Sequence, residues 1–266
     1  MRGVTSLDNL LYVLRENESS EQIEVYDIGS NRFLHCLTVT GLGNAFDIVA
    51  CGRNRCAYVS DTLHRSVQRV PLSGTAVAQW SVIDAPSCLS VSFQCSVLVT
   101  FRRDSKIKEF TTNGQLLREV VLPQDVLLPG HTVQLSTGDL VVCHGAFTYG
   151  DSLHRVCLVG SEGQLVKSYG GSQGSGSQEM NTPVHMAVDG NNFVFVVNRN
   201  IKRVMLFSPA LTYTREVLSP KQLQSIPYRL SLDRNSRRLH VAVQSTSANT
   251  VNTQPGELLL STCNNV

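Results

Sequence analysis

The segment PVHMAVDGNNFVFVVNRNIKRVMLF, residues 183–207, decides the fold of this chain. It begins with a short apolar run, passes through the turn residues Asp189 and Gly190, and continues into a second run rich in valine. A third apolar run, RVMLF, follows a short polar interval, and YTREVL at 213–218 continues the pattern. Short β-branched and aromatic runs separated by turn residues are typical of antiparallel strands. The segment therefore predicts four consecutive strands and no helix.

The same pattern recurs along the chain at nearly even spacing. In the other units the positions equivalent to His185 are Val4, Asp47, Cys88, His131 and Arg229. The steps between successive positions are 43, 41, 43, 54 and 44 residues. Four strands repeated at roughly this period are typical of the blades of a β-propeller. We therefore predict an all-β, six-bladed β-propeller over residues 1–244, with blades at about 2–40, 44–84, 86–124, 129–171, 182–219 and 227–244.

The sixth unit departs from this pattern. YRLSL and LHVAV predict its first two strands, but STSANTVNTQPGELLLSTCNNV then replaces the expected third and fourth strands. A ring that lacks these strands would leave a sheet edge uncovered. We therefore predict that the sixth blade is incomplete or degenerate, either completed in part by residues 257–262 or followed by a gap. Residues 245–266 form an atypical C-terminal tail in this interpretation.

Two units carry the residues of a known repeat. Residues 170–207, GGSQGSGSQEMNTPVHMAVDGNNFVFVVNRNIKRVMLF, and residues 56–70, CAYVSDTLHRSVQRV, resemble the NHL repeat, the second with Asp61, Arg65, Val67 and Val70 in the expected order. The resemblance extends over about residues 2–244. It implies an NHL-type propeller that serves as a scaffold for protein or RNA binding, as in the C-terminal region of tripartite-motif NHL proteins.

Composition narrows the class of protein. Hydrophobic residues make up 42% and charged residues 17% of the chain, which is the composition of a folded globular protein. A net charge of +2 does not by itself indicate nucleic-acid binding. No apolar run approaches the roughly 20 residues that cross a bilayer, so we expect no membrane contact. The eight cysteines include no C-x-x-C pair, which favours reduced, buried thiols and a cytoplasmic location.

Basic residues cluster in the segments that would join the second and third strands of several blades. These loops should lie on the face where each blade begins, where their cations could form a positive rim. The candidate binding residues are His64, Arg65, Arg102, Arg103, Lys106, Arg199, Lys202 and Arg203. Such a rim could contact a protein partner or the phosphates of RNA, although side chains that are solvated or paired with nearby carboxylates are the stronger explanation.

The positions equivalent to His185 begin the innermost strands and should line the central channel. The candidate channel-lining residues are Asp47, Cys88, His131, His185 and Arg229. A catalytic divalent metal needs three protein ligands and an open position. Arg229 would repel a cation, and the ring supplies only one carboxylate, so we predict no metal site and no cofactor.

Nothing in the sequence indicates catalysis. The one G-x-S-x-G match, GGSQG at residues 170–174, lies in a glycine- and serine-rich stretch that is not flanked by a strand and a helix, and GGSQGSGS is not followed by the Lys-Ser/Thr pair of a phosphate-binding loop. We predict a non-enzymatic binding scaffold that recognises a protein partner through its loops and takes no small-molecule substrate. RNA binding through the basic loops is the first alternative, and a metal-dependent propeller enzyme of the lyase or lactonase type is the second.

Overall fold

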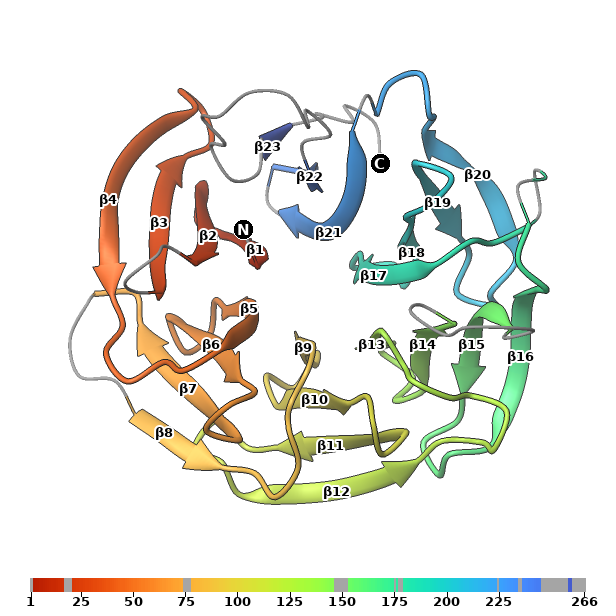
Figure 1. The fold of residues 1–266 in the computed structure, drawn as a ribbon, viewed down its shortest axis with the longest axis horizontal. Coiled ribbons are helices and arrows are strands. Elements are labelled where there is room, and N and C mark those ends of the chain that lie inside the picture. Colours follow the sequence, from red (N-terminus) through yellow and green to blue (C-terminus); the bar gives the residue numbers. More distant parts are fainter. Residues whose placement is uncertain are drawn as a thin grey trace.

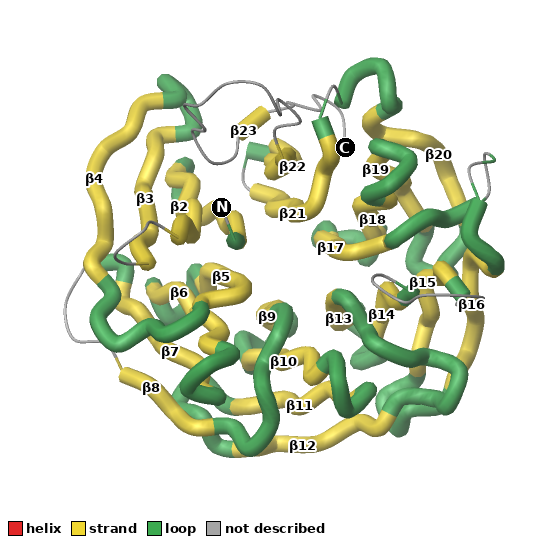
Figure 2. Tube along the Cα trace, in the orientation of Figure 1, coloured by secondary structure: helices red, strands yellow, loops and turns green. Residues whose placement is uncertain are grey.

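The computed structural model describes residues 2–16, 21–73, 78–145, 153–174, 176, 179–223, 225–233, 236–244 and 258–259. Within these ranges the chain forms strands and turns but no helix (Figure 2). No helix capable of crossing a membrane is therefore found in this part of the chain. The all-β prediction is confirmed. Most of the predicted tail, residues 245–257 and 260–266, lies outside the described residues.

The first three sheets each contain four antiparallel strands in chain order. The first comprises β1 (Gly3–Leu7), β2 (Leu10–Glu16), β3 (Glu21–Asp27) and β4 (Arg32–Thr38). The second comprises β5 (Ala45–Cys51), β6 (Cys56–Asp61), β7 (Ser66–Pro71) and β8 (Ala78–Ser81). The third comprises β9 (Leu89–Val91), β10 (Val97–Phe101), β11 (Lys106–Phe110) and β12 (Leu116–Val121).

Two further sheets also have four strands, and the last has three. The fourth comprises β13 (His131–Gln134), β14 (Leu140–His144), β15 (His154–Val159) and β16 (Leu165–Gly171). The fifth comprises β17 (Pro183–Val188), β18 (Val194–Asn198), β19 (Arg203–Phe207) and β20 (Tyr213–Leu218). The three-stranded sheet comprises β21 (Ile226–Asp233), β22 (Arg238–Gln244) and β23 (Leu258–Leu259).

The sheets stand around a central axis, with the first strand of each innermost (Figure 1). A β-propeller with five four-stranded blades is therefore confirmed. Antiparallel pairing puts the start of each innermost strand, the turn between second and third strands, and the connection to the next sheet on one face, which we call the loop face. The opposite, hairpin face carries the turns between first and second strands and between third and fourth strands.

The hydrophobic core is divided into clusters that lie between neighbouring sheets. Phe195 and Val197 of β18, for example, pack with Leu239 and Val241 of β22. Another cluster joins Val4 and Leu11 of the first sheet to Ala242 of β22, so the three-stranded sheet packs against both of its neighbours. Because both faces of each sheet are covered, middle strands such as β10 are buried along their whole length. This explains why their sequences are mostly apolar rather than alternating between apolar and polar residues.

Candidate functional site

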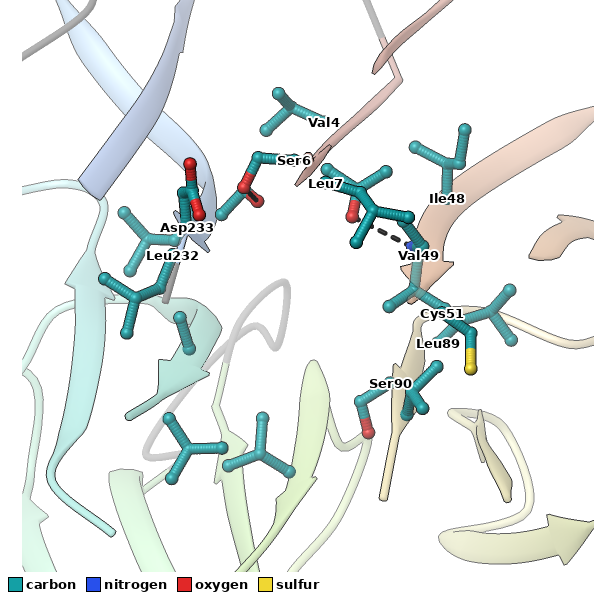
Figure 3. A pocket seen from close by; sticks show the side chains of 18 of the residues that line it. Val4, Ser6, Leu7, Ile48, Val49, Cys51, Leu89, Ser90, Leu232 and Asp233 are labelled. Atoms are coloured by element: carbon teal, nitrogen blue, oxygen red, sulfur yellow. Dashed lines mark hydrogen bonds between the residues drawn. The ribbon is translucent and has the colours of Figure 1, made fainter. Parts of the chain in front are cut away.

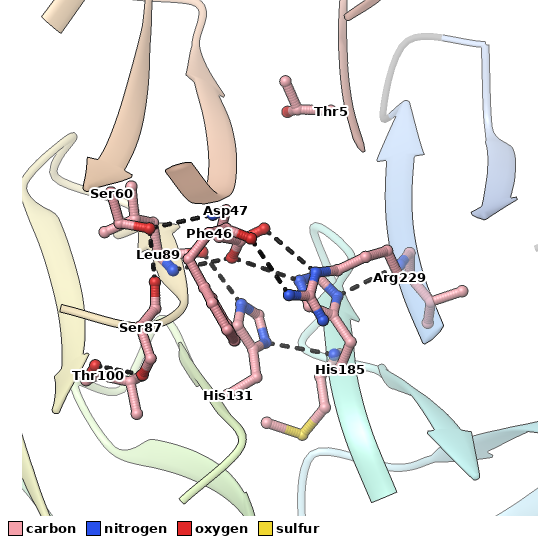
Figure 4. Close-up of polar contacts among 12 residues, drawn as sticks. Thr5, Phe46, Asp47, Ser60, Ser87, Leu89, Thr100, His131, His185 and Arg229 are labelled. Carbon is pink, nitrogen blue, oxygen red and sulfur yellow. Dashed lines mark hydrogen bonds and ion pairs between the residues drawn. The ribbon is translucent and has the colours of Figure 1, made fainter. Parts of the chain in front are cut away.

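A polar cluster occupies the centre of the ring. It consists of Asp47 on β5, His131 on β13, His185 on β17 and Arg229 on β21, each of which is less than a tenth exposed (Figure 4). The pairing of the innermost strand with its neighbour shifts by one residue immediately before Asp47, His185 and Arg229. Such bulges re-aim the side chain that follows. We therefore attribute the convergence of these three side chains on the axis to a repeated local irregularity.

Asp47 is the negative centre of the cluster. Its Oδ1 lies 3.4 Å from Nε of Arg229, and its Oδ2 lies 3.7 Å from Nε2 of His185. Burial alone would raise the pKa of Asp47, but the charge of Arg229 and the His185 ring outweigh burial and hold that pKa well below its usual range. Asp47 is therefore ionised and balances the charge of Arg229.

The two histidines are neutral and already hydrogen-bonded. The backbone N–H of Met186 donates to Nδ1 of His131 over 3.2 Å, so the proton of that ring is on Nε2, which donates to the Leu89 carbonyl over 3.0 Å. The N–H of Leu230 likewise donates to Nδ1 of His185 over 3.2 Å. Burial lowers the pKa of both rings, that of His131 to well below its ordinary value.

These contacts follow one rule that links neighbouring sheets. In three sheets, the side chain at the position equivalent to His185 accepts a hydrogen bond from a backbone N–H on the innermost strand of the next sheet. His131 accepts from Met186 and His185 accepts from Leu230, while Oδ2 of Asp47 accepts from the N–H of Leu89 over 2.9 Å. Because an innermost strand has a free edge toward the axis, these acceptors satisfy donors that would otherwise be unpaired.

Ligand atoms of Asp47, His131 and His185 lie within 4.8 Å of one another, so the three residues form a candidate metal centre. The ring geometry argues against that role. The two imidazoles are stacked, with centroids 3.9 Å apart and planes 17° from parallel. A nitrogen lone pair lies in its ring plane, and two nearly parallel planes do not converge on one ion at about 2.1 Å from each ring. Arg229 adds a positive charge beside Asp47. We therefore interpret the cluster as structural: its hydrogen bonds and ion pair link the innermost strands of neighbouring sheets.

Cys88, the remaining predicted channel residue, is buried at the same level of the third sheet. Burial raises the pKa of its thiol well above the ordinary value, against the opposing charge of Arg229. A neutral thiol at this depth is a packing group rather than a nucleophile. The structure thus brings four of the five predicted channel residues into one cluster, and Cys88 lies at the equivalent strand position beside it.

A pocket of about 470 Å³ lies along the axis toward the hairpin face (Figure 3). His131 and His185 line it together with side chains from the ends of the innermost strands. This pocket could not be predicted from the sequence, because each strand contributes only a few residues and no single unit of the repeat carries a motif for it. The only available signal was the serine two residues after the channel position in three units, at Ser6, Ser90 and Ser231.

On the loop face, two of the predicted cations of the fifth sheet hold neighbouring parts of the chain. Arg203 is only 7% exposed, and its Nη2 donates to the Gly176 carbonyl over 2.8 Å. Arg199 donates to the Gln244 side chain over 3.3 Å. Lys202 is half-buried in the adjoining turn. The arrangement differs from the exposed rim expected from sequence, because the guanidinium of Arg203 is used to fix the chain that precedes β17.

Two of the predicted basic residues, in the second and third sheets, face carboxylates. Nδ1 of His64 lies 2.9 Å from Oδ2 of the buried Asp61, and Nζ of Lys106 lies 2.9 Å from Oε1 of Glu119. From the sequence, pairing of the basic loop residues with nearby carboxylates was the alternative to a role in binding a partner. A cation already paired at the surface contributes little to recognising a second anion.

The other three predicted cations lie in the same two sheets. Arg65 and Arg103 are exposed, and Nη1 of Arg65 donates to the Ile83 carbonyl over 3.4 Å. Arg102 is half-buried, and burial lowers the pKa of its guanidinium. Among the eight predicted residues, the exposed arginines are therefore Arg65 and Arg103.

Apolar side chains on the loop face are a feature that sequence analysis missed. Leu63 is 66% exposed in the turn between β6 and β7, and Ile83 is 80% exposed after β8. Leu127 is 56% exposed in the connection from β12 to β13. In the sequence these residues look like ordinary core residues, and only the topology assigns them to connections on one face.

The fold and the central cluster place the chain in the class of β-propellers. No protein-family description and no curated protein sequence matches it. Its structure is similar to that of virginiamycin B lyase from Staphylococcus aureus, with a TM-score of 0.64 and 11% identity over 90% of this chain and 76% of that chain.

Two other solved structures show the same likeness. A chain of the nidogen/laminin complex has a TM-score of 0.65 and 13% identity, over 86% of this chain and 83% of that chain. The WD40 propeller domain of Doa1 has a TM-score of 0.59 and 13% identity, over 90% and 88%. Identities this low show the fold alone, so the NHL resemblance remains a prediction.

Proposed function

We propose that this chain is a non-catalytic β-propeller that binds a protein partner through the loop face of its second to fourth sheets. The observation that carries the proposal is the exposure of Leu63, Ile83 and Leu127 on connections of that one face. Large exposed apolar side chains grouped on one face mark interaction surfaces when polar groups surround them. Arg65 and Arg103 supply the polar surroundings.

The side chains also indicate the chemistry of the partner. Aliphatic groups next to exposed guanidinium groups match a protein segment that carries both apolar and acidic side chains. RNA recognition relies on aromatic side chains that stack on bases. Phe46 and Tyr228 lie near the start of innermost strands, close to the loop face. Their rings instead pack against the guanidinium of Arg229, with ring centroids 5.3 Å and 5.9 Å from its Cζ atom. A protein partner is therefore favoured over RNA.

The test compares two triple variants of the full chain. In the first, Leu63, Ile83 and Leu127 are replaced by serine. In the matched control, the similarly exposed Leu116, Leu117 and Val121 of the outer strand β12 are replaced by serine. Each protein is used to capture partners from lysate, and the same captured protein is then titrated in purified form.

The proposal expects one purified partner to bind the natural chain and the control variant equally, with at least tenfold weaker binding to the loop-face variant. Equal binding to both variants would place the partner elsewhere. Capture of RNA that survives removal of the three aliphatic groups but is lost on Arg65→Gln and Arg103→Gln would support the RNA alternative.

We also infer that the three-stranded sheet is a sixth blade, of which the described residues supply three strands. Strand β21 packs beside β17 on one side and β1 on the other, and Oγ of Ser6 lies 2.8 Å from Oγ of Ser231. Replacing both serines by cysteine, in a background with Cys36→Ser, should allow a disulfide to form on mild oxidation. Failure of these two positions to cross-link would mean that the ring is open there.

A further inference from the structure

Each innermost strand has one edge that pairs with no other strand and faces the axis (Figure 1). In an antiparallel pair, successive residues direct both of their backbone groups alternately toward the partner strand and away from it. The N–H groups of Leu89 on β9 and Leu230 on β21 donate to side chains of the central cluster, so these two residues face the axis. Val91 and Leu232, two residues further along the same strands, therefore also direct their N–H and carbonyl groups toward the axis.

These backbone groups of Val91 and Leu232 line the axial pocket without a partner. Side chains of the central cluster accept the inward N–H groups at its own level. At the level of the pocket, Oγ1 of Thr5 accepts the N–H of Ala50 over 2.9 Å. Among the described residues, no side chain accepts the N–H of Val91 or Leu232, although both residues line the pocket. Because β9 and β21 lie on opposite sides of the axis, each of two facing walls offers one donor and one acceptor to a ligand (Figure 1).

The charged side chains of the lining are already engaged. Asp8 pairs with Arg55, and Asp233 accepts hydrogen bonds from the hydroxyl and the backbone N–H of Ser236. The two histidines at the inner end are neutral, since Nδ1 of each accepts a backbone N–H. We therefore assign neither carboxylate to a ligand, and we expect the pocket to favour an uncharged molecule.

Apolar side chains surround the unpaired backbone groups. Leu7, Val49 and Leu232 line the pocket (Figure 3). Ser90, beside Val91, also lines it and is only 8% exposed, and its hydroxyl has no hydrogen-bond partner among the described residues. The volume of about 470 Å³ lies in the range of small-molecule sites. Water can satisfy such backbone groups, but an amphipathic ligand can replace that water and also cover the apolar side chains.

We propose that this pocket binds a neutral, amphipathic ligand that carries amide groups, as a short blocked peptide does. One amide pairs with the N–H and carbonyl of Leu232, in the way that an added strand pairs with a free sheet edge, and a second faces those of Val91. The apolar group lies against Leu7 and Val49. The site is toward the hairpin face and is independent of the loop-face surface assigned to a protein partner. It modifies the expectation that no small molecule would bind, and it requires recognition only, with no chemical step.

A matched series of probes tests both the amide and the charge. The full chain is titrated by calorimetry with N-acetylphenylalanine N-methylamide, with N-acetylphenylalanine methyl ester, which lacks one amide N–H, and with phenylalanine N-methylamide, which carries an ammonium group. The blocked amide is expected to bind at least about tenfold more tightly than either of the others. Equal affinity for the amide and the ester, tighter binding of the ammonium compound, or no binding of the blocked amide would overturn the proposal.

The natural chain gives a direct readout of the two backbone groups. An amide proton moves downfield in the NMR spectrum when it gains an acceptor. Saturation with the blocked amide should therefore move the amide protons of Val91 and Leu232 downfield. The amide proton of Glu162, on an exposed turn of the fourth sheet, is the control and should not move. Binding that leaves the amide protons of Val91 and Leu232 in place would contradict the assigned contacts.

A proline variant removes one of the two donors. Leu232→Pro deletes the inward N–H, and a free strand edge tolerates proline because its N–H does not pair with another strand. Val121→Pro, on the outermost strand β12, is the matched control. The N–H of the next residue, Leu122, donates to the Ser105 carbonyl, so that of Val121 faces away from the sheet. Leu232→Pro should weaken binding of the blocked amide by about tenfold, whereas Val121→Pro should not change it. Equal affinity in the two variants would overturn the proposal, and the NMR measurement decides if Leu232→Pro does not fold.

Discussion

Replacing Arg229 by methionine should destabilise the propeller strongly, because it leaves the carboxylate of Asp47 buried without its counter-charge. Both residues are less than a tenth exposed, and Oδ1 of Asp47 lies 3.4 Å from Nε of Arg229. Breaking a buried ion pair from one side typically costs about 3–5 kcal/mol. For a chain of this size the same change should lower the melting temperature by roughly 6 to 20 °C.

The partner variant and the double variant complete a thermodynamic cycle. Asp47→Asn keeps an acceptor for the N–H of Leu89 but leaves Arg229 as the unpaired charge, so a loss of similar size is expected. Removing both charges leaves no uncompensated ion. The double variant should therefore be more stable than the sum of the single losses predicts, by about 2 kcal/mol or more.

Urea denaturation of the four proteins, followed by circular dichroism, measures each free energy of unfolding. Lys106→Met serves as the surface control, because the two side chains of the Lys106–Glu119 pair are 35% and 33% exposed and the loss of this pair should cost far less than the loss of Arg229. If the losses of the two single variants add to within about 0.5 kcal/mol of the double variant, the two charges do not act as a pair and the reasoning fails.

Other properties of the chain can be checked with simpler measurements. Burial lowers the pKa of His144 and His240 to about 4, so only the unfolded chain takes up these protons as the pH falls below about 6.5. Stability should be constant above that pH and lower by at least about 3 kcal/mol at about pH 5.5, because the lowered pKa values of His131 and His185 add to the loss; a urea midpoint that does not move would contradict this. Gly114→Ala should destabilise the chain by about 1 kcal/mol or more and alter its tryptophan emission, because Gly114 has a φ of +86° and a Cβ there would lie 2.3 Å from the ring of Trp80. Elemental analysis should find no stoichiometric metal, and a chelator should not change the melting temperature, whereas one bound ion per chain would restore the metal-centre interpretation.

The ring architecture could be predicted from sequence because it depends on a pattern that each unit repeats. A middle strand packed on both faces must be mostly apolar, and VFVVN in the fifth unit and VLVTF in the third show this, with one polar residue each, Asn198 and Thr100. The even spacing of the channel positions likewise identified residues that meet at the axis. Asp47 and Arg229, which are 182 residues apart in the chain, become neighbours only because the units form a ring.

The chemistry of the cluster could not be predicted in the same way. Whether His131 can bind a metal depends on which of its ring nitrogens already accepts a hydrogen bond. The deciding donor is the backbone N–H of Met186, which donates to Nδ1. Because nearly every residue has a backbone N–H and a carbonyl, the sequence does not show which of these groups will form such a hydrogen bond. The burial of Arg203 has a similar origin, since its acceptor is the carbonyl of Gly176.

The division of the core between neighbouring sheets has a consequence for how the molecule opens. Val4 and Leu11 share one apolar cluster with Ala242, while Leu14 and Ile48 belong to another that joins the first and second sheets. Detaching any one sheet would therefore expose two apolar clusters to solvent at once, and with them one face of each neighbouring sheet. We therefore expect the sheets to open cooperatively, so that backbone amides on the middle strands of all sheets exchange with solvent at similarly slow rates.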